Sequence, residues 1–130
     1  MNPNGYACYS VVAYQDGHEV YTAATLVGVG QGMSNNVAEY EALRHALRYA
    51  ARHDWLGVAV RGDSKLTVEQ VNGRWAVKAA HLQPYVEECQ ALLQALGGSL
   101  VWVPREQNAR ADELSRQAYD AARAAAQGST

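Results

Sequence analysis

A loop that turns into a helix, at residues 32–43, constrains the fold of this chain more than any other stretch. Its sequence is GMSNNVAEYEAL, and three short polar residues there can cap the first free N–H groups of a helix: Ser34, Asn35 and Asn36. Apolar residues then recur at helical spacing: Leu43, Ala46 and Ala50. Glu39 lies on the same face, four residues before Leu43, where an unpaired charge would be costly to bury. The stretch therefore predicts a carboxylate that either pairs with a buried arginine or binds a cation.

Length and composition indicate a single globular domain. The chain has 130 residues, of which 48% are hydrophobic, and we expect residues 1–127 to form the domain and residues 128–130 a tail. The formal net charge is −2, so contact with nucleic acid would depend on local positive patches. Cys8 and Cys89 lie far apart without CxxC spacing, which predicts reduced core thiols. Because the sequence has no signal peptide and no long apolar run, it predicts a cytoplasmic protein without a membrane partner.

The order of the predicted elements is typical of an α/β domain. The elements are strand 6–14, strand 19–28, helix 35–53, strand 55–62, helix 64–71, helix 81–96, strand 99–104 and a helix from 108 to about 126. Asp16 and Gly17 predict a hairpin turn between the first two strands. The glycine-rich loop at residues 28–32 is a weak nucleotide-binding signature, because no GKS or GKT follows it.

Two more carboxylates stand near the ends of predicted elements. Asp63 directly follows the strand at residues 55–62, and α/β folds place their active sites at the carboxyl ends of such strands. Asp112 falls in the first turn of the last helix. No pair of residues has His/Cys ligand spacing, which disfavours a zinc site.

The connector at residues 72–78 combines one tryptophan with two cations. Trp75 is flanked there by Arg74 and Lys78. Either the ring anchors the connector to the core, or the three side chains form a platform that stacks on bases and binds phosphates. The sequence leaves both interpretations open.

Four motifs, taken together in their order and spacing, are similar to those of one known family. They are SNNVAEY at residues 34–40, RGDSK at 61–65, GRWAVK at 73–78 and VPREQNARAD at 103–112. With them the chain resembles a type 1 ribonuclease H over nearly its whole length, and most resembles the compact bacterial and archaeal branch. The resemblance implies an RNase H-like mixed sheet of five strands with helices on both faces.

The resemblance also implies endonucleolytic cleavage of the RNA strand of an RNA/DNA hybrid with two Mg²⁺ or Mn²⁺ ions. The family usually holds these ions with four carboxylates, and three residues here match the second, third and fourth: Glu39, Asp63 and Asp112. Mg²⁺ prefers hard oxygen ligands, and two ions about 4 Å apart can activate water and stabilise the leaving oxygen. Substrate contacts are implied for two groups: Asn35 or Asn36 with Lys65 near the RNA 2′-OH, and Arg74, Trp75 and Lys78 along the DNA strand.

The start of the chain departs from the family pattern. The family carries its first carboxylate in an Asp-Gly pair on the first strand, just before an Asn-Pro-rich turn that residues 2–5 resemble. We therefore expect the first, central strand and its Asp to be missing; Asp16 belongs to the opposite hairpin turn and cannot replace them. Either the sequence starts late relative to the natural gene product, or the chain is a degenerate member. A second departure is the loop at residues 105–107, where many members carry a His and where Arg105 is expected to take a charge role.

The missing strand predicts structural and functional consequences. The strands at residues 6–14 and 58–62 would both present unpaired backbone groups, and such groups cost about 1–3 kcal/mol each when buried. The two strands could close on each other, a second chain could donate a strand in a homodimer, or the isolated chain could be marginally stable. Three functions compete: an active nuclease, a catalytically impaired nucleic-acid-binding module, and an interaction domain that uses only the fold.

Overall fold

The computed structural model describes the backbone of residues 6–29 and 35–128, and the side chains of residues 10–24 and 36–121 except Asp112, Ser115 and Tyr119. Along the chain run β1 (Tyr6–Gln15), β2 (His18–Val29), α1 (Asn35–Arg52), β3 (Ala59–Gly62), α2 (Lys65–Val71), η1 (Ala80–Leu82), α3 (Gln83–Leu96), β4 (Ser99–Trp102), η2 (Arg105–Asn108) and α4 (Ala109–Gly128). This order agrees with the predicted α/β class. None of the helices in the described part of the chain is long and apolar enough to cross a membrane.

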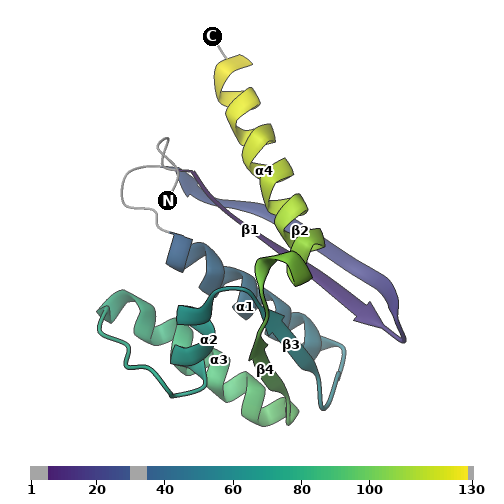
Figure 1. Cartoon of the computed structure of the whole chain (residues 1–130), viewed down its shortest axis with the longest axis vertical. Coiled ribbons are helices and arrows are strands. Elements are labelled where there is room, and N and C mark those ends of the chain that lie inside the picture. Colours follow the sequence, from purple (N-terminus) through teal and green to yellow (C-terminus); the bar gives the residue numbers. More distant parts are fainter. Residues whose placement is uncertain (1–5, 30–34, 129–130) are drawn as a thin grey trace.

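The first two strands form the predicted antiparallel hairpin. Asp16 and Gly17 make its turn with positive φ angles of 53° and 79°, a conformation that Gly and Asp adopt at low cost. Both α1 and α4 contact β1, and Figure 1 shows α4 lying across the hairpin. The hydroxyl of Ser10 donates to the backbone carbonyl of Ala111, which fixes the start of α4 against β1.

The other two strands, β3 and β4, pair in parallel. The predicted strand at residues 55–62 is wrong at its start, because β3 begins only at Ala59. Asp54 and Gly57 have φ angles of 53° and 72°, and the Gly57 N–H donates to the carbonyl of Leu96 at 2.7 Å, so residues 54–57 turn instead of extending. The predicted strand at residues 99–104 ends early at Trp102, and the expected loop at residues 105–107 is the 3-10 helix η2.

The described strands form two separate two-stranded sheets, β1-β2 and β3-β4, instead of one sheet. A cavity of about 1280 Å³ lies between β1 and β3, with α1 and the start of α4 also lining it. Along α1 the lining residues are mostly small, at four-residue spacing: Ala38, Ala42, Ala46 and Ala50. Among the described residues, β1 and β3 have no strand between them, as expected for a sheet without its central strand; the missing strand itself stays a prediction.

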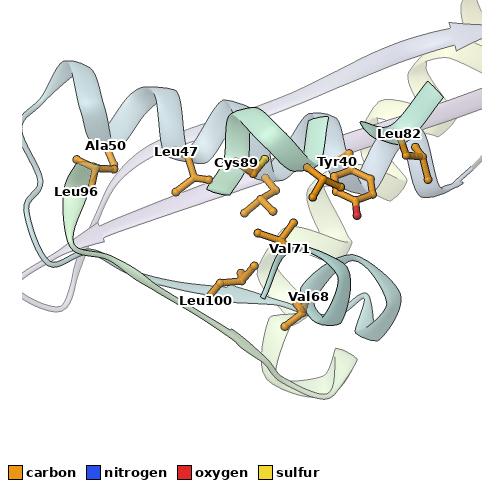
Figure 2. Packing of buried hydrophobic residues seen from close by; sticks show 11 residues of the cluster. Tyr40, Leu47, Ala50, Val68, Val71, Leu82, Cys89, Leu96 and Leu100 are labelled. Atoms are coloured by element: carbon orange, nitrogen blue, oxygen red, sulfur yellow. The ribbon is translucent and has the colours of Figure 1, made fainter. Parts of the chain in front are cut away.

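The hydrophobic core lies among α1, α2, α3 and β4 (Figure 2). Leu47 of α1 and Cys89 of α3 are fully buried in it. Burial raises the pKa of the Cys89 thiol to about 12, so this cysteine is an unreactive core residue, as predicted. The side chain of Cys8 lies outside the described residues.

A candidate active site at the end of β3

Asp63 lies between the end of β3 and the start of α2, and the residues on either side of it set these two boundaries. Gly62 ends β3 close to α2, since a Cβ at this position would lie 3.2 Å from Cγ2 of Val68. Ser64 then caps α2, because its hydroxyl oxygen accepts from the Thr67 N–H at 3.3 Å. The strand end and the cap hold Asp63 at the carboxyl edge of β3, as the sequence predicts.

Two residues from the following segments hold Asp63. The side-chain amide of Asn108 donates to Oδ2 of Asp63 at 3.1 Å, and the indole N–H of Trp102 donates to the Asp63 backbone carbonyl at 3.1 Å. The sequence patterns place Asn108 only at the start of the last predicted helix, and they do not single out Trp102. Asn108 lies in the motif at residues 103–112, and this motif could have pointed to its role. Trp102 lies beside Asp63 because β3 and β4 pair Gly62 with Trp102, a register that local patterns do not reveal.

Glu39, in the second turn of α1, lines the same cavity as Asp63 and is partly buried. The next residue, Tyr40, is fully buried and fixes this turn, since its hydroxyl donates to Oε1 of Gln70 at 2.6 Å. Burial raises the pKa of Tyr40 to about 12, so the hydroxyl remains a neutral donor. Gln70 in turn donates to the carbonyl of Ala76 at 3.2 Å. The buried bond between Tyr40 and Gln70 ties the helix that carries Glu39 to the helix that follows Asp63.

The link between Tyr40 and Gln70 makes a testable contribution to stability. Tyr40→Phe should lower the free energy of unfolding by about 1–3 kcal/mol, because it removes the donor to a buried amide oxygen while keeping the ring. Urea unfolding measures this loss. The control is Tyr14→Phe, since Tyr14 is 53% exposed and its hydroxyl is accessible to water. An equal stability for both variants would contradict the proposed link.

The third predicted carboxylate, Asp112, lies in the first turn of α4, but its side chain lies outside the described residues. Asn108 at the end of η2 lines the cavity, as do Arg110 and Ala111 at the start of α4. Among the described side chains, no three His, Cys, Asp or Glu residues gather as a metal site. Convergence of Asp112 with the other two carboxylates therefore stays a prediction.

The predicted substrate-binding residues fall into two places. Arg105 lines the cavity from η2, while Lys65 is exposed at the start of α2 with its ammonium 5.6 Å from the centroid of the Trp102 ring. Asn36 is exposed and lies inside α1 rather than at its cap. The side chains of Ser34 and Asn35 lie outside the described residues.

Residues of the connector after α2 lie away from this cavity. Trp75 is 44% exposed, which keeps both the anchoring and the platform interpretations open. Arg74 pairs with Glu69 at 2.7 Å, and this hydrogen-bonded carboxylate raises the pKa of the guanidinium. Lys78 is exposed. Of the described residues that line the cavity, none belongs to this group of three.

Comparisons with known proteins agree with the fold and the motifs. The profile of the reverse transcriptase-like family matches residues 3–118. A bifunctional protein of Mycobacterium tuberculosis, Rv2228c, is 39% identical over 122 residues, which are 93% of this chain but only 33% of that protein. The chain thus spans a third of the length of that relative.

Similarity to solved structures identifies the family of this chain more narrowly. The crystal structure of RNase H1 from Halobacterium salinarum is 30% identical, with a TM-score of 0.73 over 88% of this chain and 97% of that chain. The structure of LC11-RNase H1 in complex with an RNA/DNA hybrid is also 30% identical, with a TM-score of 0.70 over 90% of this chain and 98% of that chain. The chain therefore belongs to the reverse transcriptase-like family and, within it, to the type 1 ribonucleases H.

Proposed function

We propose that this chain hydrolyses the RNA strand of RNA/DNA hybrids in a reaction that needs divalent metal ions. The observation that carries the proposal is the shared cavity of Glu39 and Asp63, at the carboxyl end of β3 and beside the start of α4. The similar RNase H1 that was solved with an RNA/DNA hybrid supports the substrate class. We also propose the cytoplasm as its location.

The donor set fits Mg²⁺ or Mn²⁺. Glu39 and Asp63 offer hard carboxylate oxygens, which suit these cations, and we propose Asp112 as the third ligand. Two bound ions would supply an activated water and charge stabilisation at the leaving oxygen. The Asn108 amide would orient the Asp63 carboxylate, since it donates to one of its two oxygens.

Residues around the carboxylates would hold the substrate. We propose that Asn35 or Asn36 with Lys65 contacts the sugar–phosphate backbone near the RNA 2′-OH, the group that distinguishes RNA from DNA. Arg105 adds a positive charge on the cavity itself. Arg74, Trp75 and Lys78 would follow the DNA strand; for Arg74 this requires exchanging its ion pair with Glu69 for a phosphate.

A second candidate is a nucleic-acid-binding module with impaired catalysis. The observation that favours it is the open cavity between β1 and β3, where a fourth carboxylate would have to arrive on a further strand. Three carboxylates would hold two metal ions less well than four, so this second candidate predicts hybrid binding with little or no cleavage.

One assay separates the two candidates. Hybrid, single-stranded RNA and DNA duplex, each with one labelled strand, are incubated with excess protein, with Mg²⁺ or with a chelator. The nuclease should cut the RNA strand only in the hybrid and only with metal. Hybrid binding without cleavage at any metal concentration would favour the module, and absence of both would contradict both candidates.

A further inference from the structure

An exposed tryptophan is bound to the backbone of the candidate catalytic residue Asp63. Trp102, the last residue of β4, is 44% exposed although tryptophan is usually well buried. Its indole N–H is bound to the backbone carbonyl of Asp63, so the ring is held at a fixed place next to the turn that carries this carboxylate. The hydrogen bond alone does not require an exposed ring.

A positively charged side chain, that of Lys65, lies next to the Trp102 ring. The ammonium of Lys65 lies 5.6 Å from the centroid of the Trp102 ring, within the range of a cation–π contact. Lys65 is exposed and follows Asp63 by two residues. An aromatic face and a positive charge therefore adjoin Asp63, on a protein whose formal net charge is −2.

We propose that Trp102 and Lys65 form the surface that binds the RNA strand of the hybrid next to the scissile phosphate. The ring stacks on a base or a sugar, and the ammonium contacts a phosphate. We assign the contact to the strand that is cut, because the Trp102 ring is bound to the main-chain carbonyl of Asp63 and Lys65 follows Asp63 by two residues. Stacking accepts any base, which suits a nuclease that reads the kind of nucleic acid and not its sequence. This inference rests on the proposed function.

Binding measurements on the Asp63→Asn protein, which should bind the hybrid without cutting it, test the inference. Trp102→Leu should weaken hybrid binding by about tenfold, because stacking is lost. Trp102→Phe should stay within about threefold of the parent, because a ring remains while the N–H donor is gone. Lys65→Gln should lower the slope of log affinity against log salt by about one, the loss of one phosphate contact. The control Tyr14→Leu changes another exposed aromatic, at the hairpin end, and should leave binding unchanged.

Each other outcome overturns the inference. Parental affinity in Trp102→Leu, or an unchanged salt slope in Lys65→Gln, would show that the surface does not contact the strand. If Trp102→Phe binds as weakly as Trp102→Leu and both melt early, Trp102 only joins β4 to the end of β3. These three results leave the proposed function in place. If the Asp63→Asn protein itself does not bind the hybrid, the proposed function fails as well.

Discussion

Asp63→Asn should lower the rate of hybrid cleavage at least a hundredfold and leave hybrid binding intact. The amide keeps the size of the side chain but loses the negative charge that a metal ion needs, and metal ions contribute several kcal/mol of charge stabilisation in such reactions. Each 1.36 kcal/mol corresponds to about a tenfold change in rate. The rate is measured in a single turnover with excess protein and a labelled RNA strand, so that even a slow parent gives a usable value.

Asp16→Asn is the matched control for this prediction. Asp16 lines the same cavity, but it belongs to the hairpin turn, and asparagine tolerates its positive φ of 53°. The Asp16→Asn protein should cleave the hybrid at the same rate as the parent. If Asp16→Asn is as damaging as Asp63→Asn, the cavity has been assigned to the wrong carboxylate. Full activity in Asp63→Asn would show that Asp63 does not hold a catalytic metal ion.

An N-terminal extension by one strand with an Asp-Gly pair ahead of Asn2 should raise both stability and activity. The cavity of about 1280 Å³ separates β1 from β3, and a strand placed there would pair with both. Backbone groups that gain partners contribute about 1 kcal/mol each, so we expect a melting temperature higher by about 5 °C or more. The added Asp would supply a fourth carboxylate, and Mg²⁺-dependent cleavage should rise tenfold or more.

Two controls separate the effect of the strand from that of the carboxylate. The same extension with Asn in place of Asp should stabilise the chain without accelerating cleavage. A Gly/Ser extension of equal length should do neither. Open strand edges also invite association, so sedimentation should detect homodimers or aggregates of the unextended chain that the extended chain does not form. If the unextended chain is monomeric, stable and fully active, the alignment of residues 2–5 with the family turn is wrong.

Local chemistry made several elements predictable. Apolar spacing gave α1 and α3 within a few residues, Asp16 and Gly17 gave the hairpin turn, and Ser64 gave the start of α2. The motifs also led to Glu39 and Asp63, which line one cavity, while their catalytic roles stay predictions.

Other features depend on contacts between distant segments. The late start of β3 follows from the turn that joins Gly57 to the carbonyl of Leu96, and no local pattern indicates that bond. The same holds for Trp102 and Asn108, which reach Asp63 because β3 and β4 pair in one particular register. Such partners follow from the tertiary arrangement, which single-sequence periodicity does not specify.

Within the described part of the chain, β1 pairs with one strand, β2, and this has a consequence for hydrogen exchange. In an antiparallel pair, alternate residues of a strand direct their N–H groups towards the partner, so only every second amide of β1 can donate to β2. The others point towards the cavity side, where the described residues include no strand to receive them. Amide exchange along residues 10–15 should therefore alternate between slow and fast with a period of two residues. Occupation of the cavity by a strand would slow the fast set alone.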